Sequence, residues 1–177
     1  LANPAAGTTE VLDGERTGGG AFVVDRARAL DKLMKFMLPS PELFLLPLAR
    51  VAAASGARTL SLRRDGVDLV VEFDGEPLPA AAVRDPFEAV TAETPDPRLR
   101  AWGLAVLTAL RGTSRGVRLA GGRPGDLAGA WVRSPEKVDI SQKGAEGGTS
   151  FRLVGPLWRM PSLAKLKAGL ALRAPGF

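Results

Sequence analysis

The sequence predicts an α+β fold, a two-layer sandwich in which helices pack on one face of a mixed, mainly antiparallel sheet. Apolar residues recur at helical spacing before position 56 and after position 96, and they alternate with polar residues between 60 and 73. Further strand-like segments follow position 116. At 177 residues, of which 45% are apolar, the chain is long enough for one domain with its own hydrophobic core.

Two helices are expected before position 56. The first starts near Asp25 and ends at Pro39, because apolar residues follow one another at intervals of three and four. Its apolar stripe consists of Leu30, Leu33, Met34 and Met37. Ser40 followed by a proline is a helix-start signal, so a second, largely buried helix is predicted from 41 to 55. Pro47 is expected to kink this helix or to confine its regular part to the residues beyond, because proline lacks a backbone N–H.

The middle of the chain is predicted to form a β-hairpin and then a loop. The hairpin covers residues 60–73, and Arg64-Asp65-Gly66 are expected to form its turn. Several prolines make residues 74–95 irregular. We expect this stretch to be a mobile loop with one short helix at 80–90.

The last third is predicted to contain one helix followed by strands. Asp96 and Pro97 carry the signals of a helix start, and Gly112 ends the helix. Glycine-rich turns are expected at 121–125 and 144–148. The predicted strands cover residues 116–120, 128–133, 137–141 and 149–154.

The chain divides into three predicted regions. Residues 1–20 are rich in glycine and are expected to form a flexible N-terminal arm. Residues 21–155 form the α+β domain. Residues 156–177 combine leucines with Lys and Arg, and they predict a basic amphipathic extension that packs on this domain or leads to the next. Contact with a membrane surface or with a partner's groove is the alternative for this extension.

The composition excludes several kinds of chemistry. The chain has no cysteine and no histidine, which rules out disulfides, thiol nucleophiles, imidazole bases and zinc fingers. The net charge is +5, but the basic residues are scattered and no tyrosine is present to stack on a base. Nucleic-acid binding is therefore only an alternative. The charge fits the arginine-, alanine- and glycine-rich composition that is typical of a GC-rich bacterial genome.

The sequence predicts a cytoplasmic protein. No apolar stretch reaches the length of about 18 residues that a membrane-spanning helix needs, and the N-terminus lacks the order of a signal peptide. The chain begins with Leu1 and not with Met, so we expect it to be a piece of a longer protein.

Four segments at the joints between these elements resemble a known family. They are residues 48–57, ending in Ala54-Ser55-Gly56-Ala57; residues 69–78, with Asp74-Gly75-Glu76; residues 98–107, with Trp102-Gly103-Leu104; and residues 147–153, with Gly148-Thr149-Ser150-Phe151. In this order they resemble the ATP-binding domain of the GHKL superfamily, which includes gyrase, the large heat-shock chaperones, histidine kinases and MutL. The family's motifs commonly read N-A-x-D-A-G-A, D-x-G-x-G, G-x-G-L and G-T-x-F. The resemblance implies a Bergerat-type α+β sandwich over residues 21–155.

The resemblance also implies that the catalytic machinery is missing. In the family the buried helix presents a Glu as general base and, four residues later, an Asn that binds magnesium. Here these positions are Pro47 and Val51, which have neither a proton to exchange nor an oxygen for a hard cation. The Asp of the first motif is replaced by Ala54. We therefore expect no catalytic residues, no metal site and no ATP hydrolysis.

Nucleotide binding without turnover stays open as an alternative. If Gly75 matches the first glycine of D-x-G-x-G, the adenine-binding Asp is replaced by Phe73; a shift by one residue restores Asp74 but misplaces the glycine. The candidate residues for binding ATP or ADP are Asp74, Gly75, Gly103 and Thr149. Each also has a purely structural explanation, as a turn, a tight helix contact or a strand residue.

These observations favour a degenerate pseudo-ATPase domain that acts in protein–protein interaction, scaffolding or regulation. A protein partner is expected, with self-association as a further expectation and without a cofactor. One alternative is a chaperone-like or kinase-like module whose missing acid comes from another segment or subunit, for example Glu42 or Glu88. A second alternative is a nucleic-acid-binding domain that uses a basic helix face. That face consists of Arg26, Arg28, Lys32 and Lys35.

Overall fold

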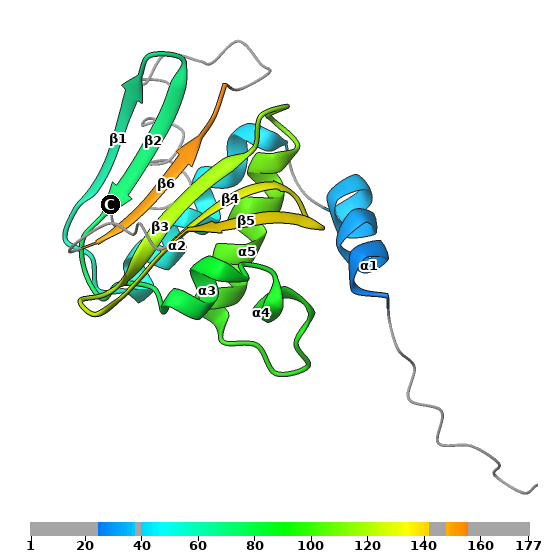
Figure 1. Cartoon of the computed structure of the whole chain (residues 1–177), viewed down its shortest axis with the longest axis horizontal. Helices are drawn as coiled ribbons and strands as arrows, with labels where there is room; N and C mark the ends of the chain where they lie inside the picture. Colours follow the sequence, from blue (N-terminus) through cyan, green and yellow to red (C-terminus); the bar gives the residue numbers. More distant parts are fainter. Residues whose placement is uncertain (1–24, 38–39, 142–147, 156–177) are drawn as a thin grey trace, which may run out of the picture.

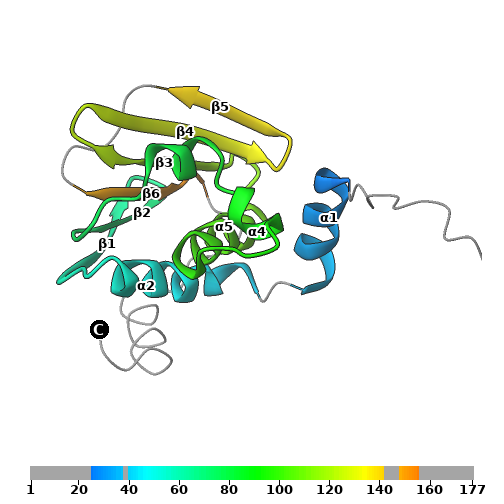
Figure 2. The same cartoon turned by 90° about the horizontal axis from the view of Figure 1, so that it is seen from below.

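One six-stranded sheet and a layer of helices make up the molecule (Figure 1). The computed structural model describes residues 25–37, 40–141 and 148–155. Seen along the edge of the sheet in Figure 2, α2 (Leu45–Ala54) and α5 (Pro97–Leu110) lie on the same side of it. The predicted α+β fold with helices on one face of the sheet is confirmed.

The strand order of the sheet is β1-β2-β6-β3-β4-β5. Every described pairing is antiparallel, so the sheet is not mixed as the sequence suggested. β6 lies between β2 and β3, where Phe151 pairs with Val71 on one side and with Leu119 on the other. The strands are β1 (Leu60–Asp65), β2 (Asp68–Phe73), β3 (Val117–Arg123), β4 (Asp126–Ser134), β5 (Lys137–Ser141) and β6 (Thr149–Leu153).

The hydrophobic core lies between the sheet and the helices α2 and α5. Alternate residues of the central strands point into it, as the period of two requires, and both helices are largely buried. Phe151 is at its centre, with the ring of Phe44 stacked at 5.4 Å and that of Trp102 edge-on at 5.7 Å between centroids. These rings join β6 to the 3₁₀ turn directly before α2 and to α5, so the last described strand is needed to complete the core.

The first helices follow local signals in the sequence. Asp25 caps α1 (Arg26–Lys32) by accepting hydrogen bonds from the backbone N–H groups of Ala27 and Arg28. The helix continues as a π-helical segment, η1 (Leu33–Met37). A 3₁₀ turn, η2 (Pro41–Phe44), then precedes α2.

Pro47 does not interrupt α2. It lies in the first turn of the helix, where backbone N–H groups have no partner within the helix in any case. The 3₁₀ geometry of η2 takes up the change of direction before it. The α-helix starts at Leu45, two residues before Pro47, so its regular part is not confined to the residues beyond the proline as the sequence suggested.

The proline-bearing stretch forms two helices, not the single one predicted at 80–90. α3 (Ala80–Arg84) and α4 (Glu88–Thr91) are separated at Pro86. Asp85, which precedes the proline, has φ −129° and ψ 86°, as expected of a residue kept out of the helical region by the proline ring. α5 starts as predicted, with Asp96 as its cap and Pro97 in its first turn.

Two predicted turns are placed differently in the structure. The turn of the first hairpin is Gly66-Val67, because Asp65 already pairs with Asp68. The predicted turn at 121–125 is mostly strand: Gly121 and Gly122 belong to β3 and pair with β4. The predicted turn at 144–148 lies, up to residue 147, outside the described residues, as do the N-terminal arm 1–20 and the extension 156–177. Within the described ranges, no helix is long and apolar enough to cross a membrane.

Candidate functional site

Three of the four candidate nucleotide-binding residues lie at one end of the sheet. Asp74 and Gly75 directly follow β2, and Thr149 begins β6 opposite Phe73. Gly103 lies within the second turn of α5, and its nearest neighbours are Pro86 and Val90 of the α3–α4 segment. The fold thus brings Asp74, Gly75 and Thr149 together, whereas Gly103 belongs to a different contact.

Asp74 is occupied by the backbone of the turn that leads into β1. Its Oδ1 accepts hydrogen bonds from the N–H groups of Arg58 and Thr59, both at 2.8 Å. The hydrogen bond from the Thr59 N–H is the largest cause that holds the pKa of Asp74 below its ordinary value; desolvation opposes it, and the Arg58 N–H adds a further lowering. The carboxylate therefore fixes the α2–β1 turn to the end of β2.

Gly75 allows the same two segments to approach closely. Its φ is +97°, and a Cβ at this position would lie 2.5 Å from the carbonyl oxygen of Ser55 and 2.8 Å from the nitrogen of Ala57. The next residue, Glu76, donates its N–H to the Ser55 carbonyl at 2.7 Å. A glycine is needed here for packing within the chain, whatever else the site does.

Gly103 is the point where α5 meets the α3–α4 segment. A Cβ on it would lie 2.3 Å from the carbonyl oxygen of Pro86 and 2.4 Å from a methyl carbon of Val90. One residue earlier, Trp102 donates its indole N–H to the carbonyl of Ala82 at 3.1 Å. The family's glycine segment would open a helix over the phosphates, but this glycine lies inside a helix and is covered by Pro86 and by Val90 of α4.

Thr149 and Phe73 are both buried. The hydroxyl of Thr149 accepts a hydrogen bond from the N–H of Leu78 at 3.4 Å, and the ring of Phe73 belongs to the hydrophobic core. Val51, at the family's magnesium position, is also fully buried in that core. The groups that would surround a nucleotide in the family are thus held by contacts inside the chain.

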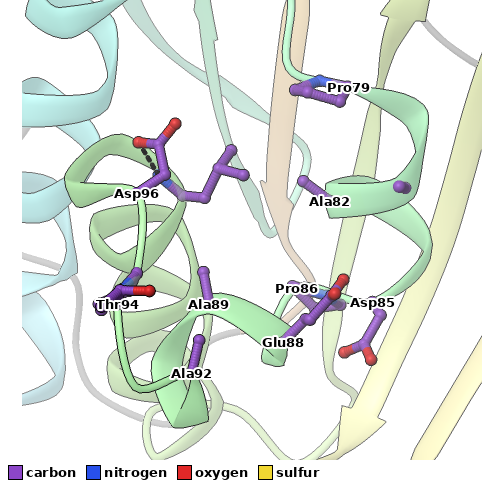
Figure 3. A pocket seen from close by; sticks show the side chains of 12 residues that line it. Pro79, Ala82, Asp85, Pro86, Glu88, Ala89, Ala92, Thr94 and Asp96 are labelled. Atoms are coloured by element: carbon purple, nitrogen blue, oxygen red, sulfur yellow. Dashed lines mark hydrogen bonds between the residues drawn. The ribbon is translucent and has the colours of Figure 1, made fainter.

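The structure places a cavity of about 220 Å³ between α3, α4 and the start of α5 (Figure 3). Its walls are mostly apolar, and three carboxylates from Asp85, Glu88 and Asp96 lie at it. Asp96 caps α5, and Asp85 pairs with Arg26 and accepts the N–H of Phe87. Glu88, one of the acids considered as a substitute base, lines this cavity. The side chain of Glu42 is outside the described part of the chain.

An ion-pair cluster beside Asp74 was not predicted from the sequence. The guanidinium of Arg98 lies 3.1 Å from a carboxylate oxygen of Glu76, and Arg123 lies 2.7 Å from the other. The hydrogen bond from Arg123, and then the charge of Arg98, hold the pKa of Glu76 below its ordinary value. These residues come from α5, β3 and the segment after β2, so no local pattern in the sequence indicates the cluster.

The basic face predicted for the first helix is largely paired with acids. Arg26 contacts Asp85, and Lys35 contacts Asp31 one turn away. A second basic group lies on the sheet face away from the helices: the guanidinium carbons of Arg118 and Arg133 are 4.9 and 4.2 Å from the ring centre of Trp131. This stacking was missed because Arg118 and Trp131 meet only through the pairing of β3 with β4.

Comparisons with known proteins add no further assignment. A scan against protein-family models finds no matching family. A search of curated proteins finds no similar sequence. The resemblance to the GHKL superfamily thus continues to rest on the four sequence segments.

Proposed function

We propose that this chain is a degenerate GHKL-type domain that acts in the cytoplasm as a protein-interaction or regulatory scaffold and does not hydrolyse ATP. One observation carries the proposal: the positions at which the family would hold a nucleotide are occupied by contacts within the chain. Gly103 is covered by Pro86 and Val90, and Phe73 and Val51 are part of the core.

The chemistry of the remaining groups supports the same conclusion. A general base for the attack of water needs a carboxylate or an imidazole within reach of the phosphate, and magnesium needs hard oxygen ligands. Pro47 and Val51 offer neither. Asp74, the remaining acid near the expected adenine position, accepts two backbone hydrogen bonds that fix its own turn.

The test is calorimetric titration of the full chain with ATP and with ADP, with and without magnesium, up to low-millimolar nucleotide. Circular dichroism first establishes that the protein is folded. We expect no saturable heat. Saturable binding that is lost in Asp74→Asn, but kept in Asp68→Asn at the other end of β2, would overturn the proposal and favour the alternative of a nucleotide-binding module.

One observation favours a second candidate function, binding of single-stranded nucleic acid. On the sheet face opposite the described helices, Trp131 combines an aromatic ring with Arg118 and with Arg133, which also pairs with Asp139. Such groups stack bases and neutralise phosphates. The test is fluorescence anisotropy of a labelled oligo(dT): binding by this face has to fall steeply with salt and be lost in Trp131→Ala.

A further inference from the structure

β5 forms the outer edge of the described sheet. β5 is the last strand in the sheet order and pairs with β4 on one side; among the described residues, no strand pairs with its other side (Figure 2). Ile140 on this strand is 59% exposed. A strand at such an edge presents a row of backbone N–H and C=O groups that a further strand can pair with.

The side chains of β5 are arranged differently on its two faces. Val138 and Ile140 pair with Val132 and Ala130 and share the face that the helices cover. Lys137 and Asp139 lie on the opposite face. Natural edge strands are often protected by charges that repel a second copy. Here Lys137 and Asp139 carry opposite charges and stand two residues apart. An antiparallel copy of the same strand can therefore place each of these charges opposite the other and be attracted.

We propose that two copies of the chain pair antiparallel through β5, with Val138 opposite Val138 of the second copy. In this register, Lys137 of each copy lies opposite Asp139 of the other, which forms two opposite-charge pairs on one face. A two-fold axis at Val138 makes the interface self-complementary. The two sheets then continue into one another.

The alternative registers are less favourable. A shift that places Asp139 opposite Asp139 of the second copy brings two like charges together, which destabilises a cross-strand pair. A shift by one residue would turn the apolar face of one strand to the charged face of the other.

Arg133 already pairs with Asp139 within the chain. The Asp139 carboxylate can accept hydrogen bonds both from Arg133 and from Lys137 of the second copy.

Apolar contacts on the helix side support the proposed register. Val138 and Ile140 form an apolar strip with Leu30 of α1 and Phe87 in a groove of about 440 Å³, whose other lining residues include the charged Arg26, Arg84, Asp85 and Glu136. In the proposed register the two Val138 side chains lie side by side, and each Ile140 lies diagonal to the other copy's Val138. The apolar strip therefore continues across the interface. The paired segment is short compared with standard protein interfaces, so we expect a concentration-dependent dimer.

Charge exchange on β5 tests the proposal. Sedimentation of the full chain at increasing concentration is expected to show a shift from monomer to dimer. Asp139→Lys alone and Lys137→Asp alone each place like charges opposite one another and should abolish the dimer. An equimolar mixture of the two variants restores both opposite-charge pairs and should form a heterodimer. Arg64→Asp, on the other edge strand β1, is the matched control and should dimerise as the unmodified chain does.

A disulfide tests the register. Because the chain contains no cysteine, Val138→Cys introduces a single thiol, and two such residues that lie opposite one another are close enough for a disulfide. We expect efficient cross-linking of Val138→Cys under mild oxidation and little cross-linking of Ile140→Cys, which lies about 13 Å from its own copy in this register. Efficient cross-linking of Asp139→Cys instead would overturn the register.

The proposal concerns a different surface from the nucleotide position and is tested without nucleotide. It fails if the full chain stays monomeric at all concentrations, or if the charge variants dimerise as well as the unmodified protein. Neither result bears on whether ATP binds. The melting temperatures of all variants are measured alongside, so that loss of the dimer is not confused with loss of the fold.

Discussion

Arg98 is bound to Glu76 through both the side chain and the backbone of that residue. One guanidinium nitrogen lies 3.1 Å from the carboxylate, and the other donates to the Glu76 carbonyl at 2.9 Å and to the Pro77 carbonyl at 2.9 Å. Only 14% of the Arg98 side chain is exposed. Through these bonds the start of α5 fixes the segment that follows β2.

Replacing Arg98 by Met should destabilise the fold by about 1–3 kcal/mol, because it leaves the two carbonyl groups without their donor. The measurement is the free energy of unfolding in urea. Arg123→Met is the matched control, since it removes the other cation of Glu76 from a side chain that is 71% exposed. That change should cost less than about 1 kcal/mol. Equal losses in the two variants would contradict the structural role of Arg98.

The fold should lose stability in acid through Asp74 and Glu76. Both carboxyl groups have a folded-state pKa below their ordinary values of 3.8 and 4.5. A depressed pKa adds stability that is complete above the unfolded pKa and is lost as the pH falls through the folded pKa. We expect urea unfolding to show a declining free energy below pH 4.5, and a shallower decline in Asp74→Asn and Glu76→Gln. Glu93→Gln, which removes an exposed carboxylate outside this cluster, serves as the control.

Gly75→Ala should be among the most destabilising substitutions of the glycines that the structure describes. The new Cβ would meet the backbone of Ser55 and Ala57 in addition to the strain of a positive φ. Gly125 is a matched control, because its φ of +90° is similar but nothing lies within 4 Å of the added carbon. Thermal unfolding should show a larger loss for Gly75→Ala than for Gly125→Ala. A loss of the same size would mean that the close approach of the two segments is unimportant.

Gly103→Ala tests whether the α3–α4 segment packs against α5, because the direction of the change in stability depends on that contact. In an open helix this change gains about 1 kcal/mol of stability from helix propensity. Here the added carbon meets the backbone of Pro86, so overpacking by about 1–3 kcal/mol should dominate and lower the melting temperature. A higher melting temperature would show that the α3–α4 segment does not lie on Gly103.

Much of the fold could be predicted because its signals are local. Asp96 and Pro97 mark the start of α5 within a few residues, and the alternation over 60–73 gives the hairpin β1–β2 directly. The break at Pro86 also has a local cause, but the short apolar run around it suggested one continuous helix.

What could not be predicted depends on contacts between distant segments. Gly121 was expected in a turn, yet it lies in β3. The absence of a side chain leaves room for Val83 of α3, since a Cβ on Gly121 would lie 3.2 Å from a methyl carbon of Val83. The pairing of Arg98 with Glu76 joins residues that are 22 positions apart. Asp74 was a candidate for nucleotide binding only in the shifted register of its motif, and the structure places its carboxylate on the N–H groups of Arg58 and Thr59.

Introducing at Pro47 and Val51 the Glu and Asn that the GHKL resemblance implies should not produce ATP hydrolysis. Val51→Asn places an amide in a fully buried apolar site and should cost about 2–4 kcal/mol, more than Val51→Ala, which removes only apolar contacts. Pro47→Glu changes a half-buried residue in the first turn of α2, where an acid is tolerated, and should cost less than about 1 kcal/mol. Urea unfolding measures these costs, and phosphate release measures activity in the double variant. ATP hydrolysis by the double variant would contradict this prediction. It would mean that the contacts of Gly103 and Phe73 leave room for a nucleotide, because the new Glu and Asn can act only on a phosphate that is already bound.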